Sequence, residues 1–310
     1  GYDGTRLWDA TTGRQLLNLA GGHLPIWSKD ESKILTVSVD NILSIWDATT
    51  GKELVKFPGH KSGVNSAVWN KDESKILTAS YDGTARIWDT ATGHELLRLA
   101  GHTGTVWQAR WSKDESKILT ASEDKTARIW DAASGQELVA LKGHTSSVYQ
   151  AIWNRNESKI LTASDDGTAR IWDVTTGYQL AKLEGHSGRV TQAVWSQDEK
   201  RILTRSDDST ARIWDATTGK VLATLEGHSD KVTAAAWSKD GSKVLTASGD
   251  STARIWYVHM KDLLAAACAS TPRNFAWDEW NVYMKDEYRP TCSNAPIPPD
   301  VITAIKDKAR

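Results

Sequence analysis

One stretch of sequence, Gly59–Asp89, recurs along the chain with little change and limits what the chain can fold into. Further copies lie at Gly101–Asp131, Gly143–Asp173 and Gly185–Asp215, and a fifth copy, Gly227–Trp256, is followed by Tyr257 where the others have aspartate. The histidines near the start of the copies are 42 residues apart, and so are the tryptophans near their ends. Self-similarity at a fixed period of this length indicates a repeat architecture.

Each copy and the segment after it carry four short β-prone runs. In the first full copy the runs are Val64–Trp69, Lys75–Ser80, Thr84–Trp88 and His94–Leu99, and the dipeptide Asp82-Gly83 is a tight-turn signal. No segment of the copy shows the i, i+3, i+4, i+7 spacing of an amphipathic helix. Four strands in 42 residues is the size of one β-propeller blade, so we predict an all-β fold.

Three dipeptides carry a resemblance to a known family. Gly-His opens each copy, Asp-Gly occupies the turn in several copies, and Trp-Asp ends the third run. With this spacing, residues 1–257 resemble the WD40-repeat β-propeller family. Counting the Trp-Asp-type ends gives seven units, and the first begins inside a repeat. We therefore expect a seven-bladed propeller with an incomplete first blade, in a chain that is a fragment of a longer one.

The second unit is shorter than the others. Trp8 and Trp27 are 19 residues apart, whereas Trp46 and Trp69 are 23 apart, so four residues are missing around the segment 21–26. Pro25 argues against a central strand there, because proline removes a backbone donor. We expect His23 not to complete the hydrogen-bonded network that the resemblance implies for the regular copies.

The WD40 resemblance implies a hydrogen-bonded tetrad of histidine, hydroxyl, aspartate and tryptophan inside each blade. A buried indole N–H needs an acceptor, which a hydroxyl supplies, and the hydroxyl of the first full copy is Thr78 or Ser80. On this interpretation most histidines, aspartates and threonines of the repeats belong to the scaffold. The expected tetrads are His60, Thr78, Asp82 and Trp88; His102, Thr120, Asp124 and Trp130; His144, Thr162, Asp166 and Trp172; His186, Thr204, Asp208 and Trp214; and His228, Thr246, Asp250 and Trp256.

Composition and motifs exclude several classes of function. The formal net charge of -1 gives no basic footprint for nucleic acid, and no run of 18 apolar residues exists that would span a membrane. The phosphate-loop, GxSxG, HExxH and CxxC motifs are absent from the sequence. We predict no catalytic residues, no metal and no cofactor, and hence no enzyme. The low number of cysteines, 2, favours a cytoplasmic location.

The residues after the repeats, 258–310, form a second region in which the pattern breaks. Asp262–Ser270 and Ala276–Lys285 have helix-favouring composition, and a Pro-rich segment follows, so we expect a small helical and Pro-rich extension. Its segments ACASTPRNF, EW and YRPTC resemble the C-terminal ends of propellers carried by bacterial STAND-type signalling NTPases. Cys268 and Cys292 are candidates for a disulfide, for metal ligands or for buried thiols.

Positions that vary between nearly identical copies are candidates for binding. One follows the first valine of the first run, and the other precedes the aspartate of the turn; in the propeller family these positions line the top rim. They give an aromatic arc beside an acidic arc, which fits a protein or peptide ligand with a basic segment. Neutral drift between recent duplicates is the alternative. The candidate binding residues are Tyr81, Trp107, Tyr149, Glu123, Asp165, Asp207 and Asn65, with Arg205, which replaces an alanine found in other copies.

Together these features predict a non-catalytic protein- or peptide-binding module. The resemblance of the tail implies the sensing end of a larger bacterial signalling protein. A self-standing scaffold of duplicated repeats with no specific rim ligand is the alternative, and an enzyme that uses the central channel is a third hypothesis. Fold class does not decide between them.

Overall fold

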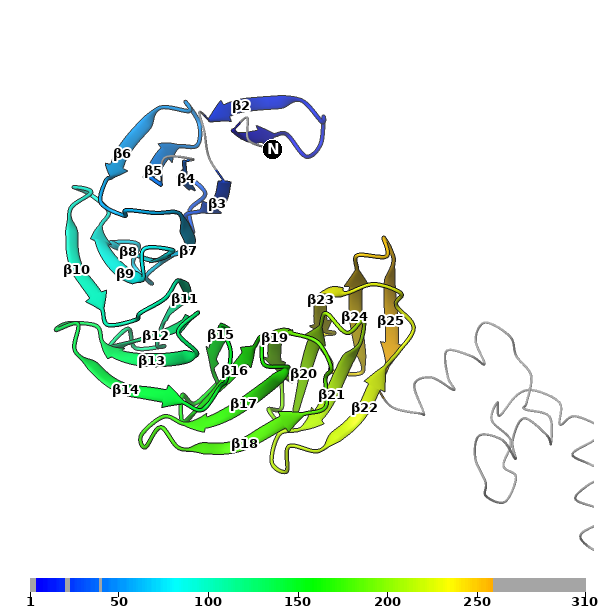
Figure 1. The fold of residues 1–310 in the computed structure, drawn as a ribbon. Coiled ribbons are helices and arrows are strands. Elements are labelled where there is room, and N and C mark those ends of the chain that lie inside the picture. The colour runs from blue at the N-terminus through cyan, green and yellow to red at the C-terminus, as the bar shows by residue number, and fades with distance from the viewer. Residues whose placement is uncertain (1–3, 20–22, 39–40, 259–310) are drawn as a thin grey trace, which may run out of the picture. The chain divides into compact units, whose positions relative to one another are not determined.

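The computed structural model consists of small antiparallel sheets that follow one another along the chain, and it describes residues 4–19, 23–38 and 41–258 (Figure 1). By internal contacts the chain divides into two compact units, Gly1–Ala235 with Ala247–Thr252 and Ala236–Thr246 with Ala253–Arg310. All regular elements in the described residues are β-strands. The prediction of an all-β repeat fold is confirmed, whereas the helical tail lies outside the described residues.

The first sheet has two strands, β1 (Thr5–Trp8) and β2 (Gln15–Leu19), and the described residues then form five four-stranded sheets. Their strands are β3 (His23–Trp27), β4 (Lys33–Val37), β5 (Leu43–Asp47) and β6 (Glu53–Phe57); β7 (Val64–Trp69), β8 (Lys75–Ser80), β9 (Thr84–Asp89) and β10 (Glu95–Ala100); β11 (Val106–Trp111), β12 (Lys117–Ser122), β13 (Thr126–Asp131) and β14 (Glu137–Lys142); β15 (Val148–Trp153), β16 (Lys159–Ser164), β17 (Thr168–Asp173) and β18 (Gln179–Glu184); β19 (Val190–Trp195), β20 (Arg201–Ser206), β21 (Ala211–Asp215) and β22 (Val221–Leu225). The last copy carries β23 (Val232–Trp237), β24 (Lys243–Ser248) and β25 (Ala253–Tyr257).

In every four-stranded sheet the strands pair antiparallel in chain order, so the first and fourth strands are the two edges. The second strand is central and reads as an almost continuous buried run, as in β8, because neighbouring sheets cover both of its faces. The fourth strand is mostly exposed or half-buried, with one buried residue near its end, as in β6 and β10.

An aspartate and a glycine shape the turn between the third and fourth strands. The Asp89 carboxylate accepts a hydrogen bond from the backbone N–H of Thr92 at 2.8 Å, and the Gly93 N–H donates to the Asp89 carbonyl at 2.9 Å. Gly93 has a φ of +75°, and a Cβ added there would lie 2.3 Å from the Lys56 carbonyl oxygen of the neighbouring sheet. Glycine is therefore required at this position by both conformation and space.

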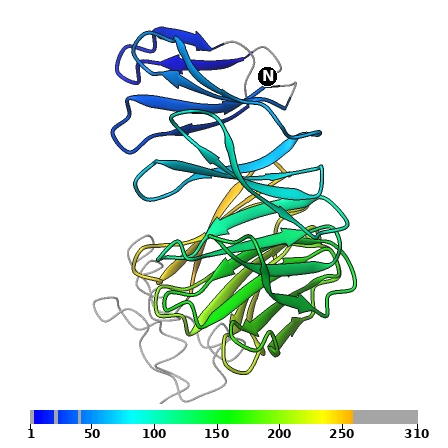
Figure 2. The same ribbon diagram turned by 90° about the vertical axis from the view of Figure 1, so that its left-hand side faces the viewer.

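The hydrophobic core lies between successive sheets of the first unit. Leu77, Ile87 and Leu99 of one sheet pack against Val106 and Trp130 of the next, and the same arrangement recurs at the neighbouring interfaces. Figure 2 shows the backbone of these successive sheets from the side. The tryptophans that end the third strands, Trp88, Trp130, Trp172 and Trp214, are at most 1% exposed. Burial of these large aromatic surfaces stabilises each interface.

In the shortened second unit, Pro25 lies on an edge strand and not on a central one. The segment around Pro25 does form a strand, β3, which pairs with β4 through a register shift between His23 and Ile26. Because β3 is an edge strand, the missing proline N–H interrupts no central ladder. The His23 side chain lies outside the described part of the chain, so its exclusion from a tetrad stays a prediction.

The second compact unit holds the end of the last copy. The Trp256 indole N–H donates to Thr246 Oγ1 at 2.8 Å, and the Val258 N–H donates to the Ser242 carbonyl at 2.9 Å. Tyr257, which replaces the usual aspartate, lies under the Lys243 ammonium, with 5.3 Å from Nζ to the ring centroid.

Candidate functional site

Inside the first full copy of the repeat, the structure brings four predicted residues together. His60 Nδ1 lies 2.8 Å from the Asp82 carboxylate, and His60 Nε2 lies 2.7 Å from Thr78 Oγ1. The Trp88 indole N–H donates to the same Thr78 oxygen at 2.9 Å. Since the carboxylate accepts, Nδ1 carries the proton, and the Thr78 hydroxyl donates to Nε2. These contacts link the second and third strands of the sheet, the turn between them and the loop before the first strand.

The same geometry recurs in the following copies. The distances from histidine Nδ1 to aspartate are 2.7–2.8 Å, those from Nε2 to threonine 2.7 Å, and those from the indole to threonine 2.8 Å. In the last copy His228 lies 2.8 Å from Asp250, and Trp256 donates to Thr246 at 2.8 Å. In the shortened unit Trp46 donates to Thr36 at 2.8 Å.

The serine that was the alternative hydroxyl has another partner. Ser80 Oγ donates to the Gly63 carbonyl at 2.9 Å and accepts from the Asp82 N–H at 3.0 Å. Threonine is therefore the tetrad hydroxyl, and serine holds the turn that carries the aspartate.

The surroundings of the tetrad shift the pKa values of several of its groups. Burial opposes ionisation of Asp82, but hydrogen bonds from His60 and Thr84 outweigh it and keep the pKa of the carboxyl far below its usual value of 3.8. The pKa of Asp166 is lowered in the same way, by hydrogen bonds from His144 and Thr168 that outweigh burial. For His144, burial outweighs the attraction of Asp166 and lowers the pKa of the imidazole below 6.5, so an ionised Asp166 faces a neutral His144 at physiological pH.

Although the tetrad contains the residue types of a nucleophilic triad, its geometry argues against that chemistry. Thr78 is 0% exposed, and its oxygen is already bonded to His60 and Trp88. A nucleophile has to reach a substrate, and this hydroxyl is enclosed. The tetrad is therefore a structural network.

The aromatic residues predicted for the rim form a continuous ladder. The ring centroids of Tyr81 and Trp107 are 5.5 Å apart, and those of Trp107 and Tyr149 are 5.6 Å apart. Tyr81 is 51% exposed, whereas Trp107 and Tyr149 are partly buried. We call the surface formed by Asn65, Tyr81, Trp107, Glu123, Tyr149, Asp165, Arg189 and Asp207 the top rim.

Two of these residues also join neighbouring sheets. The Asn65 amide donates to the Val106 carbonyl at 3.0 Å, and the Trp107 indole N–H donates to Ser147 Oγ at 2.9 Å. The polar groups of Asn65 and Trp107 therefore have partners within the chain, and the aromatic faces are what the rim offers to a ligand.

The acidic arc contains a basic residue that the sequence analysis missed. Arg189 pairs with Asp207 at 2.7 Å, approaches Asp165 at 3.6 Å, and lies 3.5 Å from the Tyr149 hydroxyl. In the three preceding copies a small residue, Gly63, Thr105 or Ser147, stands directly before the first-strand valine. The change to a charged residue at position 189 is the sequence signal that could have identified Arg189 as a rim residue. Because Arg189 contacts two of the three acids, Glu123 is the exposed carboxylate of the arc without an ion pair in the described residues.

Arg205, the last of the candidate binding residues, has partners within the chain. Its Nε donates to Gln192 at 2.9 Å, and its Nη1 donates to the Val232 carbonyl at 3.2 Å. The side chain therefore connects β20 to β19 and to β23, and its role in binding stays a prediction.

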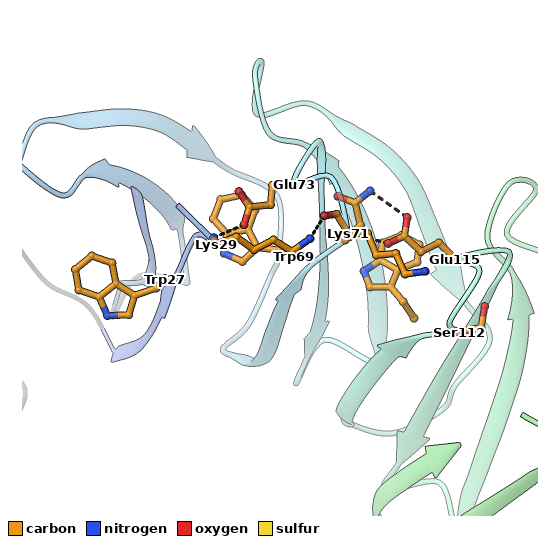
Figure 3. A pocket seen from close by; sticks show the side chains of 9 residues that line it. Trp27, Lys29, Trp69, Lys71, Glu73, Ser112 and Glu115 are labelled. Atoms are coloured by element: carbon orange, nitrogen blue, oxygen red, sulfur yellow. Dashed lines mark hydrogen bonds between the residues drawn. The ribbon is translucent and has the colours of Figure 1, made fainter. Parts of the chain in front are cut away.

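A separate hollow of about 300 Å³ lies where the first strands end, lined by Trp27, Trp69 and Trp111 with polar residues (Figure 3). Several of its polar groups are engaged: Lys29 Nζ donates to the Lys71 carbonyl, and the Glu73 carboxylate accepts from the Lys29 N–H at 2.5 Å. The indole N–H groups of Trp69 and Trp111 are buried without a hydrogen-bond acceptor. The hollow therefore presents mainly aromatic surface.

Two glutamates beside this hollow, Glu73 and Glu115, connect neighbouring sheets by hydrogen bonds. Glu115 accepts from the Lys71 N–H and from the Asn70 amide, the latter at 3.3 Å. Glu73 and Glu115 have φ values of +61° and +62°, in the left-handed region that disfavours side chains with a Cβ. Their bonds to the preceding sheet offset this local strain.

The fold and its site define a class, a repeat protein of antiparallel four-stranded sheets stabilised by His-Thr-Asp-Trp tetrads. The WD40 family, described as WD domain, G-beta repeat, matches residues 51–89, 93–131, 135–173, 177–215 and 219–257, and the chain belongs to this family. WD40 domains generally mediate protein–protein interactions and are generally not enzymes. No curated protein matches the chain.

Among solved structures, the chain is similar to the crystal structure of the computationally designed Ika8 protein, crystal packing No.1 in P63. The sequence identity is 28%, the TM-score is 0.72, and the match covers 83% of this chain and 79% of the other. This similarity supports the all-β repeat fold.

In the part of the chain that the structure describes, no three histidine, cysteine, aspartate or glutamate side chains are grouped as metal ligands. Among the same residues no helix has the length and apolar character needed to cross a membrane.

Proposed function

We propose that this chain is a non-catalytic module that binds a protein or peptide at its top rim. The observation that carries the proposal is the ladder of Tyr81, Trp107 and Tyr149, which presents contiguous aromatic surface on an otherwise regular scaffold. Aromatic residues are frequent binding anchors because they bury a large area at little entropic cost.

The charge beside the ladder gives the partner's chemistry. Arg189 pairs with Asp207 and approaches Asp165, so Glu123 is the group available to a basic side chain. We infer a ligand segment in which an apolar or aromatic residue packs on the ladder and a neighbouring lysine or arginine meets Glu123. A net charge of -1 gives no support for nucleic acid as the partner.

The cellular setting belongs to the same proposal. On the resemblance of the tail to STAND-type propeller ends, residues 1–257 would be the cytoplasmic sensing region of a larger bacterial signalling protein, with residues 258–310 as its extension. A self-standing scaffold is the second candidate. It is favoured by the near-identity of the repeats and by the similarity to a designed protein.

The test is a comparison of captured partners in lysate of the source organism. Wild-type chain, a Tyr81→Ala/Trp107→Ala/Tyr149→Ala variant and a Tyr178→Ala control are immobilised; Tyr178 is 74% exposed on β17–β18, outside the top rim. We expect partners that are retained by the control and lost by the triple variant. Because Trp107 also bonds Ser147, a Tyr81→Ala/Glu123→Gln variant provides a second reading with less effect on stability. If the same partners bind wild type, the rim variants and the control equally, the proposal that the top rim binds the partner is wrong.

A further inference from the structure

In two of the sheets an arginine of the third strand, buried or partly buried, has a carboxylate partner on the fourth strand. Arg86 Nη1 lies 2.7 Å from Glu95, and its Nη2 lies 2.9 Å from Asp82. Arg128 makes the equivalent contacts, 2.7 Å to Glu137 and 3.1 Å to Asp124. In both sheets the charge of the guanidinium is balanced within the sheet.

This balance weakens in the next two sheets. Arg170 Nη1 donates to the neutral amide of Gln179 at 2.8 Å. Arg212 has Val221 at the corresponding position, nine residues later, and no ion pair joins Arg212 to a carboxylate in the described part of the chain. Its Nε is buried without an acceptor, although the residue as a whole is partly exposed. An arginine left in this state costs free energy that an added carboxylate would recover.

The strand that covers Arg212 is unusual in a second, independent respect. Among the fourth strands of the four-stranded sheets, β6, β10, β14 and β18 each carry charged residues, whereas β22, Val221–Leu225, carries none. Val221 is 40% exposed and Leu222 is 54% exposed. Charged side chains on an edge strand discourage pairing with other strands. At the edge strand β22 the exposed charges are Lys220 and Glu226, directly before and after the strand, and none lies along its length.

We propose that the outer edge of β22 is a docking site for an extended segment of a partner protein that carries a glutamate. The backbone of the segment would pair with β22 as an added strand, and the glutamate carboxylate would bind Arg212 in the place that Glu95 and Glu137 occupy in their own sheets. An added strand lies two strand spacings, about 10 Å, from β21, a distance that an arginine and a glutamate bridge when they extend toward each other. The small Val221 side chain leaves this path open.

The length of the acidic side chain is part of the proposal. Aspartate is one methylene shorter than glutamate and reaches less far across β22. Glutamine keeps the length but lacks the charge that makes a hydrogen bond to arginine strong. The site therefore discriminates in the order glutamate, then aspartate or glutamine.

The experiment measures binding of a fluorescein-labelled peptide, TVEVTV, to the full chain by fluorescence anisotropy, with TVDVTV and TVQVTV as matched probes. We expect saturable binding of the glutamate peptide that is about tenfold tighter than that of either control, as follows from one charge-assisted bond. Val221→Glu supplies the missing carboxylate from within the chain, as in the neighbouring sheets, and should remove this preference while raising resistance to denaturant. Val221→Gln, which copies Gln179, is the uncharged control and should retain part of the preference.

The proposal is overturned if the glutamate and glutamine peptides bind wild type equally, or if neither shows saturable binding. It is also overturned if Val221→Glu binds the glutamate peptide as tightly as wild type does. Because the top rim is unchanged in both variants, these outcomes leave the proposed rim function untouched.

Discussion

The tetrad aspartate gives the most specific energetic prediction, and Asp166→Ala is the perturbation. Its carboxylate is 4% exposed and accepts from His144 Nδ1 at 2.8 Å, the Thr145 N–H at 3.0 Å, and Thr168 through N–H at 3.0 Å and hydroxyl at 2.6 Å. Arg170 lies 3.5 Å away. Alanine leaves these donors without their acceptor and Arg170 without a counter-charge.

Each hydrogen bond to a charged group contributes about 1.5–3 kcal/mol, but the contributions of a shared acceptor do not add. Removing one partner of a buried ion pair costs about 3–5 kcal/mol, and we expect a loss of that size in the free energy of unfolding. Guanidinium chloride unfolding, followed by tryptophan fluorescence and circular dichroism, measures it.

The neighbouring residue supplies the matched control. Asp165 has a side chain that is 31% exposed, and it contacts Ser146 at 2.9 Å and Arg189 at 3.6 Å. Asp165→Ala should therefore cost less than about 1 kcal/mol. If Asp166→Ala costs no more than Asp165→Ala, the reasoning about the tetrad is wrong.

Three further predictions concern pH, the glycines of the turns and the glutamate that connects neighbouring sheets. The free energy of unfolding should fall on acidification. Below pH 6.5, His144 takes up a proton more readily in the unfolded chain than in the folded chain, where its pKa is lowered. Below about pH 4 the same holds for the carboxylate of Asp166, whose pKa is also lowered in the folded state. Denaturant titrations at pH 7, 5 and 3.5 measure this, and higher stability at pH 5 than at pH 7 would contradict it. Gly93→Ala should lower the free energy of unfolding by more than about 2 kcal/mol, because the added Cβ would clash with the Lys56 carbonyl. The control Gly13→Ala should cost about 1 kcal/mol, because Gly13 has the similar φ of +68° but no atom within 4 Å of the added Cβ. Equal melting temperatures of the two variants would show that the clash with Lys56 contributes nothing. Glu115→Ala should destabilise by about 1–2 kcal/mol, and Glu115→Gly by less, because glycine relieves the left-handed backbone while losing the same bonds. The reverse order in urea unfolding would show that the backbone at position 115 is not strained.

The repeat period made most of the fold predictable. Because the histidine, aspartate and tryptophan of each copy recur at one spacing, their meeting could be inferred from one copy and applied to the rest. Thr78 and Ser80 could not be separated from sequence, since both lie on the same face of β8. The difference follows from hydrogen bonds that only the folded turn defines.

The contacts between sheets were not predicted. Arg189 meets Tyr149 across 40 residues, and Glu115 meets Lys71 across 44, so each partner lies in the neighbouring copy. Analysis of one repeat as a unit does not show such pairs, and their geometry depends on how successive sheets pack. The bond from Arg205 to the Val232 carbonyl of the following copy is another contact of this kind.

The central claim is that the top rim holds the partner, and a hydrogen–deuterium exchange footprint tests it most directly. The chain is measured alone and with the protein captured in the lysate comparison. The account predicts slower exchange on binding at the backbone around Tyr81, Trp107 and Tyr149, with the outer strands β6, β10, β14 and β18 unchanged. Protection confined to those outer strands, with the top rim unchanged, would contradict it.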